Sequence, residues 1–233
     1  MADFESQVRL CDYGTQVTAS HPDYHSSLAQ PRKFYGRLGK PIFDIFFVLL
    51  LLPVLVPVIC VLALIVSLDG AAPFYTQRRV GRNGRLFWIW KLRTMVPDAD
   101  ARLEAHLAAD PRAREEWNDK QKLTDDPRIT RFGRILRRTS MDELPQFLNV
   151  LSGQMSVVGP RPMMAGQEVL YPGRSYYALY PGVTGSWQVS DRNATSFAAR
   201  AAYDDAYARS VSFRTDLAVI HKTVRVVLRA TGC

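Results

Sequence analysis

Residues 131–162 carry the densest set of chemically active side chains in the sequence, RFGRILRRTSMDELPQFLNVLSGQMSVVGPRP. An adjacent carboxylate pair, Asp142 and Glu143, lies among five arginines: Arg131, Arg134, Arg137, Arg138 and Arg161. A carboxylate can attack phosphorus as a nucleophile when nearby cations bind the phosphate and offset the charge repulsion. A surface that only binds phosphate gains nothing from negative charge at its centre. The pattern therefore favours phosphoryl transfer.

The carboxylate pair is expected at the start of a helix. Ser140 followed by Glu143 matches a capping box, and Gly153 is a natural helix end. Apolar residues recur at helical spacing and should form the buried face: Leu144, Phe147, Leu148 and Leu151.

The other side of this helix is expected to be polar, with Asp142, Gln146 and Asn149 opposite the apolar stripe. Free N–H groups and the helix dipole favour an anion in the first turn, which should keep Asp142 ionised. The alternative is that Asp142 and Glu143 only cap the helix and pair with neighbouring arginines.

Residues 45–68, IFFVLLLLPVLVPVICVLALIVSL, contain no charged side chain, which predicts a segment that meets a membrane. More than forty residues come first, including Glu5, Arg9 and Asp12, whereas the apolar core of a signal peptide lies near the N-terminus. We therefore interpret the segment as a permanent anchor.

The topology of this anchor is suggested by its flanks, which are basic on both sides and favour entry and exit through one membrane face. Pro53 and Pro57 each remove a helical hydrogen bond, so we place the turn of a re-entrant hairpin there. The two helical arms of such a hairpin, residues 43–56 and 58–68, would each be roughly 15–20 Å long. This is too short to cross the hydrocarbon core of a bilayer, which is about 30 Å thick. The alternative is one proline-kinked helix that spans the bilayer.

The composition limits the function classes. The 233 residues suffice for one catalytic domain with attachments, and a net charge of +8 favours partners that carry phosphate. Three cysteines, odd in number and far apart, argue against a disulfide framework or a structural zinc site. A rival hypothesis is a membrane-anchored protein whose basic face binds nucleic acid or anionic lipid without catalysis.

Three other regions have simpler patterns. Residues 1–35 lack any period and predict a mobile tail. Residues 73–95 alternate aromatic and basic side chains around Asn83 and Gly84, which predicts a strand or membrane-facing edge beside a turn. Residues 98–122 predict a solvated helix or a helix pair interrupted at Pro111.

From Lys40 to Leu228 the chain resembles the bacterial sugar transferases, also called monotopic phosphoglycosyl transferases. The matching segments are FD at Phe43, TQRRVGRNG from Thr76, KLRTM from Lys91, DPRITRFGRILRRTSMDELPQFLNVLSG from Asp126, MSVVGPRP from Met155, PGVTG from Pro181 and WQVSDRN from Trp187. The resemblance implies an α-rich α+β fold, with a re-entrant membrane helix hairpin at residues 36–69. A catalytic domain at residues 70–233 would lie on the cytoplasmic face of the bacterial inner membrane.

The resemblance also assigns roles to individual residues. Asp142 would be the nucleophile, and Glu143 would support metal or substrate binding, with Mg²⁺ as the implied ion held at this pair. Four basic residues match phosphate-binding or substrate-binding positions of the family: Lys91, Arg93, Arg137 and Arg161. Magnesium would neutralise the diphosphate and assist departure of the nucleoside monophosphate.

The implied reaction moves galactose-1-phosphate or glucose-1-phosphate from a UDP-hexose to undecaprenyl phosphate. It would pass through a phosphosugar on Asp142, release UMP and start an exopolysaccharide or capsule, with no role for nucleic acid. TGSWQ at residues 184–188 resembles the hexose-transferring members, and an N-acetylated UDP-sugar is the alternative donor. The sequence leaves open the sugar, the polysaccharide and whether the enzyme forms a homodimer.

Three positions depart from the family pattern. Val56 stands before Pro57 where serine is usual, so a hydroxyl that could satisfy freed backbone groups is missing. Gln154 replaces a usual aspartate, and Asp191 replaces a usual glycine, whose conformation an aspartate adopts less easily. We expect none of the three to abolish activity.

Overall fold

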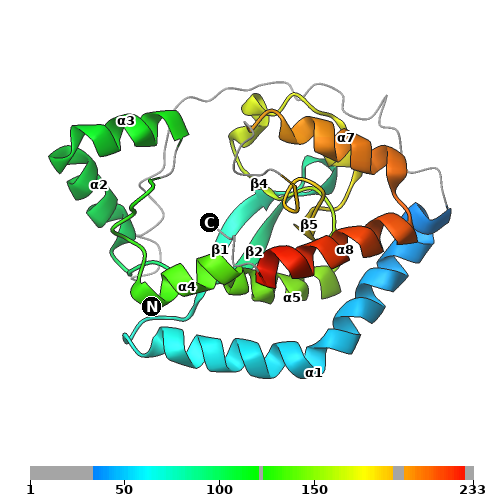
Figure 1. Cartoon of the computed structure of the whole chain (residues 1–233), viewed down its shortest axis with the longest axis horizontal. Helices are drawn as coiled ribbons and strands as arrows, with labels where there is room; N and C mark the ends of the chain where they lie inside the picture. The colour runs from blue at the N-terminus through cyan, green and yellow to red at the C-terminus, as the bar shows by residue number, and fades with distance from the viewer. Residues whose placement is uncertain (1–33, 121–122, 191–196, 229–233) are drawn as a thin grey trace.

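The computed structural model describes residues 34–120, 123–190 and 197–228, and shows a mainly helical protein with two small β-sheets (Figure 1). The α-rich α+β prediction is thereby confirmed. The α-helices are α1 (Lys40–Ser67), α2 (Ala99–Ala109), α3 (Pro111–Lys120), α4 (Arg131–Thr139), α5 (Phe147–Leu151), α6 (Ser175–Ala178), α7 (Arg200–Ser210) and α8 (Phe213–Leu228).

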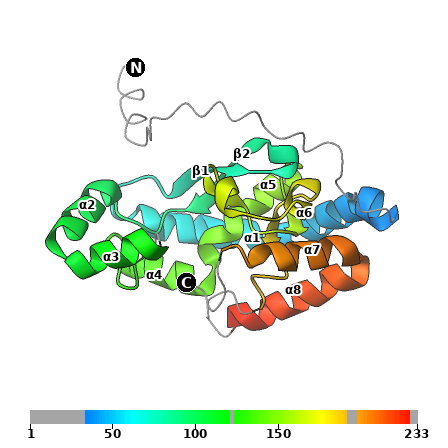
Figure 2. The same cartoon turned by 90° about the horizontal axis from the view of Figure 1, so that it is seen from above.

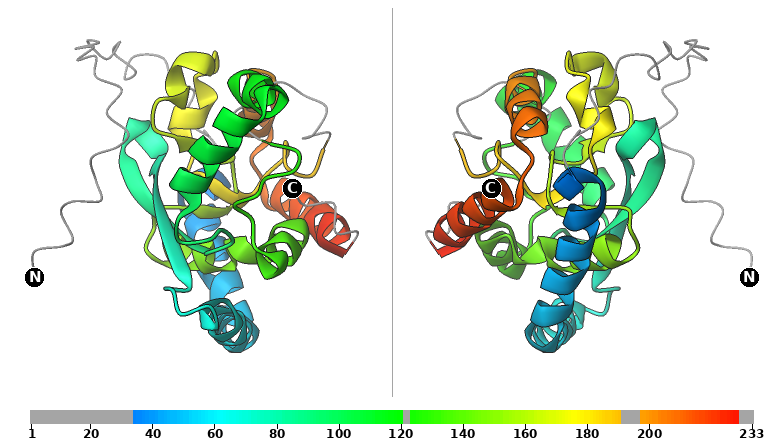
Figure 3. Two further views of the ribbon diagram at one scale, coloured as in Figure 1. Left: turned by 90° about the vertical axis from the view of Figure 1, so that its left-hand side faces the viewer. Right: turned by 90° about the vertical axis from the view of Figure 1, so that its right-hand side faces the viewer.

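The larger sheet is built on a β-hairpin. Strands β1 (Phe74–Val80) and β2 (Leu86–Leu92) pair antiparallel, and the short strand β4 (Met163–Met164) joins the other edge of β1. Asn83 and Gly84 in the connecting turn both have positive φ, 58° and 75°, which asparagine and glycine tolerate best. The predicted strand and its turn are confirmed, and Figure 3 shows the hairpin as an outer layer of the molecule.

The second sheet joins two segments that are separate in the sequence. Strand β3 (Ser156–Val158) pairs in parallel with β5 (Gly182–Thr184). The backbones approach so closely that a Cβ on Gly182 would lie 2.1 Å from the nitrogen of Gly159, so only glycine fits. This pairing fixes the start of the Gly-Pro-Arg-Pro turn, which follows β3.

Helix α1 is one continuous helix of 28 residues that contains both Pro53 and Pro57. It bends in its middle (Figure 1), as expected where prolines remove helical hydrogen bonds. The hairpin of two separate arms is therefore not confirmed. Residues Tyr35–Ser67 form one helix long and apolar enough to cross a membrane, and little of it is buried.

The first turn of α1 is fixed to the catalytic domain by buried charged and hydroxyl groups. Lys40 Nζ lies 2.7 Å from Asp216 Oδ2 on α8, and the same carboxylate accepts hydrogen bonds from Tyr35 (2.7 Å) and Tyr207 (2.6 Å). Asp44 accepts a hydrogen bond of 2.6 Å from Ser156 on β3. We call Tyr35, Lys40, Asp44, Tyr207 and Asp216 the anchor cluster.

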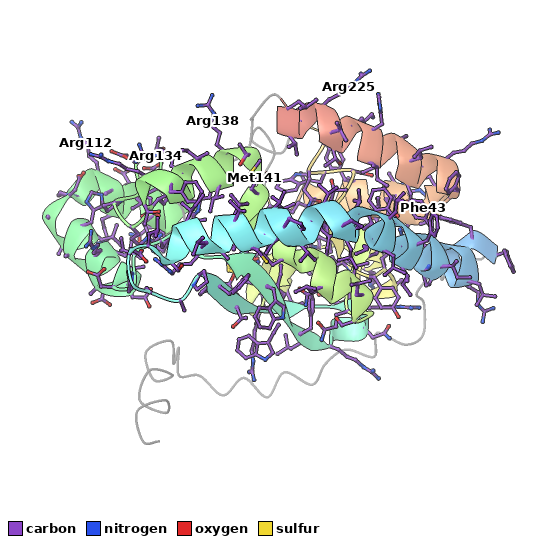
Figure 4. All side chains as sticks on the ribbon, turned by 90° about the horizontal axis from the view of Figure 1, so that it is seen from below. Phe43, Arg112, Arg134, Arg138, Met141 and Arg225 are labelled. Atoms are coloured by element: carbon purple, nitrogen blue, oxygen red, sulfur yellow. The ribbon has the colours of Figure 1, made fainter. Side chains whose placement is uncertain are left out.

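The far end of α1 is also fixed to the catalytic domain. The Arg93 guanidinium binds both carboxylate oxygens of Asp69 and donates to the carbonyl of Val66 in the last turn. The buried side chains of Val66 and Ala63 belong to one apolar cluster with those of Leu92 and Leu136. Since both ends contact the same domain, α1 lies along that domain rather than leading away from it (Figure 4).

The main apolar core lies where α1 meets the two sheets and α7–α8. It includes Val48 of α1, Ile89 of β2, Val158 of β3, Tyr207 of α7 and Val219 of α8. Figure 2 shows α7 and α8 on one side of the molecule and the hairpin on the other. The predicted helix pair of residues 98–122 is confirmed as α2 and α3, which pack through a separate small cluster around Leu107, Ala113 and Leu123.

Candidate active site

The carboxylate pair lies in η4 (Met141–Gln146), a 3-10 helix between α4 and α5. Ser140 has the left-handed conformation (φ 57°) and ends α4, and its side chain makes no capping hydrogen bond to η4. The predicted capping box is therefore wrong. Pro145 lacks a backbone N–H, which suits a short irregular turn better than a regular helix.

The predicted burial of this segment is reversed. Asp142, Gln146 and Asn149 are buried, whereas Leu148 is half exposed. The reason is that the polar side packs against β2, where the Asn149 carboxamide accepts from Trp90 N (3.1 Å) and donates to Trp88 O (2.7 Å). Asn149 thereby satisfies backbone groups at the free edge of β2, and this interaction holds η4 beside the strand.

Lys91 and Arg161 bind the carboxylate pair from two elements. Lys91, near the end of β2, places Nζ 2.6 Å from Glu143 Oε1 and 3.7 Å from Asp142 Oδ2. Arg161, in the turn after β3, places Nη2 3.1 Å from Glu143 Oε1. Glu143 thus accepts from two cations at one oxygen, and we call Lys91, Arg137, Asp142, Glu143 and Arg161 the site cluster.

Arg137 completes the site cluster from the last turn of α4. Its Nε donates to Thr94 Oγ1 at 2.8 Å, which orients the guanidinium. Burial lowers the pKa of Arg137, and the negative charge of Asp142 acts in the opposite direction, which indicates that the two groups lie near each other.

The two carboxylates differ in electrostatic environment. Burial raises the pKa of Asp142 above its ordinary value, although the charge of Lys91 opposes this change. Burial also acts to raise the pKa of Glu143, but Arg161 and Lys91 outweigh it and hold that pKa well below the usual range. Glu143 is therefore firmly ionised, whereas the ionisation of Asp142 depends on its cations rather than on a helix dipole as we expected from the sequence.

Arg93 does not join the site cluster. Its hydrogen bonds go to Asp69, to Val66 O at the end of α1, and to the carbonyls of Ala72 and Met95. The resemblance placed Arg93 among the phosphate-binding residues, but in the structure it fastens α1 to β2. Only Leu92 separates Arg93 from Lys91 along the chain, yet of these two basic residues only Lys91 contacts the carboxylates.

The structure gives Gln154 a clear contact. Its Oε1 accepts a hydrogen bond of 2.8 Å from Asn149 Nδ2, so this side chain orients the carboxamide that holds β2. Val56 lies inside α1 with its side chain exposed, and the helix continues past it without a serine hydroxyl. Asp191 lies outside the described residues.

Among the described residues, no group of three or more His, Cys, Asp or Glu side chains is placed to hold a metal ion. Magnesium usually binds to one or two carboxylates and completes its shell with waters and substrate phosphates. The adjacent Asp142 and Glu143 therefore fit a magnesium ion that arrives with a phosphorylated substrate, and they do not form an independent metal cage.

A cavity of about 250 Å³ opens beside Glu143 and Arg161. Its walls are mainly apolar and come from α1, η4, α5 and α8: Phe47, Leu51, Leu144, Phe147, Ile220, Val224 and Val227. Figure 4 shows α1 crossing this face between α8 and the hairpin, with Met141 beside it. Leu144 and Phe147, two members of the apolar stripe predicted for the core, thus line a cavity that ends at charged groups.

Thr94, which orients Arg137, was not singled out from the sequence. Asn149 was expected on the polar face with Asp142, but its role in fixing η4 to β2 was not. Both lie inside segments that match the family, KLRTM and FLNVLSG, so their positions were visible but their contacts were not.

Comparisons with known proteins bear on this site. A family model described as bacterial sugar transferase matches residues 35–230. The chain is 44% identical over 202 residues to a UDP-galactose-lipid carrier transferase of Erwinia amylovora. The matched region covers 86% of this chain and 42% of that relative. It is 41% identical over 200 residues to the exopolysaccharide production protein ExoY of Sinorhizobium fredii, covering 84% and 88% of the two chains.

A third relative, an undecaprenyl-phosphate glucose phosphotransferase of Komagataeibacter xylinus, is 34% identical over 210 residues. The match covers 84% of this chain and 37% of that relative. This chain therefore spans about two fifths of the length of the Erwinia and Komagataeibacter relatives and most of the length of ExoY.

Proposed function

The chain belongs to the bacterial sugar transferase family, and we propose that it transfers hexose-1-phosphate from a UDP-sugar to undecaprenyl phosphate. The names of its relatives mention galactose, glucose, a lipid carrier and exopolysaccharide production. We propose galactose or glucose as the sugar and the first step of an exopolysaccharide or capsule as the role.

The observation that carries this proposal is the position of the site cluster at the end of the apolar cavity. Lys91, Arg137 and Arg161 supply three cations around two carboxylates, which leaves positive charge for phosphate. The cavity beside them offers apolar walls. A reaction between a nucleotide diphosphate and a phosphorylated lipid needs both features in one place.

In the first half-reaction, an Asp142 carboxylate oxygen attacks the β-phosphorus of the donor. A bond from Asp142 to phosphorus forms while the bond from that phosphorus to the bridging oxygen breaks, and the electron pair leaves on UMP. Lys91 and Arg161 bind phosphate oxygens and stabilise the charge that develops, and Lys91 also favours the ionised form of Asp142.

In the second half-reaction, a phosphate oxygen of the lipid acceptor attacks the same phosphorus. The Asp142–phosphorus bond breaks, the carboxylate is restored, and the sugar leaves on a diphosphate-linked lipid. The first isoprene units would lie along Phe47 and Leu51 of α1 and Val224 and Val227 of α8. Apolar burial there would place the lipid phosphate beside Arg161.

Magnesium belongs to this proposal through the fit of Asp142 and Glu143 described above. When bound with the donor, it would neutralise diphosphate charge and ease departure of the leaving group. Glu143, firmly ionised between Lys91 and Arg161, is the more suitable permanent ligand, while Asp142 keeps an oxygen for the attack.

We also propose that α1 enters and leaves the bacterial inner membrane through its cytoplasmic face. Support comes from the attachment of both ends of α1 to one domain, through Lys40–Asp216 and Arg93–Asp69. Cysteines placed at Arg37 and Arg85, both exposed, test this in intact cells. Both should resist an impermeant periplasmic reagent, and labelling at Arg37 alone would indicate a spanning helix.

The experiment that tests the reaction uses the full chain in detergent with undecaprenyl phosphate, magnesium and a panel of UDP-sugars. We expect UMP release and a lipid-linked product with UDP-galactose or UDP-glucose. Preference for an N-acetylated donor would change the sugar but keep the reaction. Salt-dependent binding of nucleic acid or anionic lipid, with no UMP from any donor, would replace the proposal with a non-catalytic binding protein.

A further inference from the structure

A second group of arginines lies beside the Arg161 turn. Arg79 of β1 donates from Nη1 to the carbonyl of Pro162 at 3.1 Å, which places it directly beside the Arg161 turn. Pairing of β1 with β4 fixes this position, because Arg79 lies opposite Met164. Arg200 begins α7, and its guanidinium lies 4.1 Å from the ring of Trp187.

Packing brings α7 close to β1 and β4, because Ala201, next to Arg200, shares one apolar cluster with Val80, next to Arg79, and with Met163. Burial, followed by the charge of Arg161, lowers the pKa of Arg79 to about 10, and the same two causes lower the pKa of Arg200 to about 10. Like charges that lie close together produce this effect. Arg79 and Arg200 remain cationic near neutral pH.

Negative charge near this group is limited. Glu143 is shared between Arg161 and Lys91. Asp204 faces Arg200, but burial raises the pKa of Asp204 to about 7, and its carboxylate accepts a hydrogen bond from Tyr171. In the described part of the chain, the buried Nε atoms of Arg79 and Arg200 have no hydrogen-bond partner. Arg79 Nη2 donates to Gln77 Oε1 at 2.6 Å, a neutral acceptor that leaves the charge of the guanidinium in place. The group therefore carries positive charge that the nearby carboxylates do not fully offset.

We propose that Arg79 and Arg200, beside the Arg161 turn, bind the phosphate of the departing nucleoside monophosphate. This inference rests on the proposed function and extends it to the leaving group. Lys91 contacts Asp142 and Glu143, Arg161 contacts Glu143, and Arg79 binds the carbonyl of Pro162, the residue after Arg161. Displacement at phosphorus requires the leaving oxygen to lie opposite the attacking oxygen, and for this reason we assign the leaving phosphate to the arginines beside Arg161 rather than to the groups that contact Asp142.

The charge balance of the step fits these residues. As the Asp142 oxygen bonds to the β-phosphorus, the bridging oxygen takes the electron pair of the broken bond and stays on the α-phosphate. The leaving nucleoside monophosphate gains negative charge there, which two guanidinium groups can stabilise. The contact with the Trp187 ring restricts the Arg200 side chain, so less side-chain entropy is lost on binding.

The test measures binding of UMP to the full chain in detergent by isothermal titration calorimetry. Arg200→Gln and Arg79→Gln should each weaken binding by about tenfold or more, because each removes charge-assisted hydrogen bonds. Arg209→Gln, at the exposed far end of the same helix α7, should bind UMP like the wild type. Uridine, which lacks the phosphate, should bind all four proteins with equal affinity.

Arg79 also supports the Pro162 carbonyl, so thermal unfolding of each variant is recorded, and Arg79→Lys replaces Arg79→Gln if the latter unfolds. A folded Arg200→Gln variant with wild-type affinity for UMP would overturn the inference, and so would a wild type that does not bind UMP. A wild type that binds UMP through Arg200 but transfers no phosphosugar to undecaprenyl phosphate would instead contradict the proposed function. The two failures are thus distinguishable.

Discussion

The anchor cluster and the site cluster are both buried groups of opposite charges, yet they differ in how completely the protein satisfies them. In the anchor cluster, Asp216 is fully buried, and its two oxygens accept from Tyr35, Lys40 and Tyr207 at 2.6–2.7 Å. In the site cluster, Lys91 and Arg161 converge on one oxygen of Glu143, and Arg161 and Glu143 line the cavity.

The two clusters use the same residue types, but the anchor cluster has a structural role and the site cluster a reactive one. The anchor cluster contains one cation and two carboxylates, all enclosed by protein. The site cluster contains three cations and two carboxylates and adjoins open space, so it retains positive charge for a ligand. Burying an ion pair costs desolvation free energy. In the anchor cluster, protein contacts offset this cost, whereas in the site cluster a bound substrate can offset part of it.

The largest expected effect is a loss of transfer activity when the site cluster is changed. Asp142→Asn keeps the size of the side chain but removes the anionic oxygen, so transfer should fall about a thousandfold or more. Incubation with labelled UDP-hexose and no lipid should leave a phosphosugar on the Asp142 peptide of the wild type only. The exposed Asp125→Asn serves as the control and should keep wild-type activity. UMP release near the wild-type rate in Asp142→Asn would refute the covalent mechanism.

The next largest expected effect is a loss of folding stability when the anchor cluster is changed. Asp216→Asn leaves the buried Lys40 without its closest carboxylate, and we expect a loss of about 3–5 kcal/mol in the free energy of unfolding. Asp98→Asn, which breaks an exposed ion pair with Arg102, should cost less than about 1 kcal/mol. Denaturant unfolding in detergent measures both. Equal stability of the two variants would mean that the anchor cluster does not hold α1.

A smaller effect concerns geometry at constant charge. Arg161→Lys keeps the cation but loses the planar guanidinium that binds Glu143 and phosphate, so kcat/KM should fall at least about tenfold, or 1.4 kcal/mol. Arg134→Lys, on the exposed face of α4, provides the matched control. Unchanged kinetics for Arg161→Lys would restrict Arg161 to a structural role.

The smallest effect is a shift of the pH profile. Because burial raises the pKa of Asp142, the nucleophile gains a proton at a higher pH than an ordinary aspartate, whose pKa is about 4. As the pH is lowered, phosphosugar formation should therefore begin to decline while the pH is still above about 4. Lys91→Met removes a charge that lowers the pKa of Asp142, so this decline should move to higher pH. Rapid-quench measurements between pH 4 and 8 would test this, with roughly half-unit steps. An acid limb that does not move in Lys91→Met would mean that Lys91 does not tune Asp142.

The two carboxylates should affect stability in opposite directions. The lowered pKa of Glu143 means that its ion pairs stabilise the fold above the ordinary glutamate pKa of about 4.3 and that this stability is lost as the pH falls. The raised pKa of Asp142 means that its ionisation costs stability as the pH rises from the ordinary aspartate value through the raised one. This cost is consistent with a residue kept for chemistry rather than for the fold.

Local patterns were sufficient for several elements because the interactions involved are local. Asn83–Gly84 predicted the hairpin turn, and Pro111 divided α2 from α3. The uncharged run predicted an apolar membrane segment, but the structure has one bent helix where we expected two arms. The capping box at Ser140 failed because Ser140 adopts a left-handed conformation that ends the preceding helix. The burial of η4 and α5 was reversed because β2, far away in the sequence, supplies polar backbone groups to Asn149.

The sequence by itself determined the residue types for phosphate chemistry, the apolar segment and the family resemblance through Asp142, Glu143 and Arg161. Only the tertiary structure decided which basic residues reach the carboxylates: Lys91 contacts Glu143 across 52 positions, whereas Arg93 binds the end of α1. It also joined Lys40 to Asp216 across 176 positions. Such pairs depend on how helices and strands pack, because side-chain direction and burial are set by neighbours that no local pattern specifies.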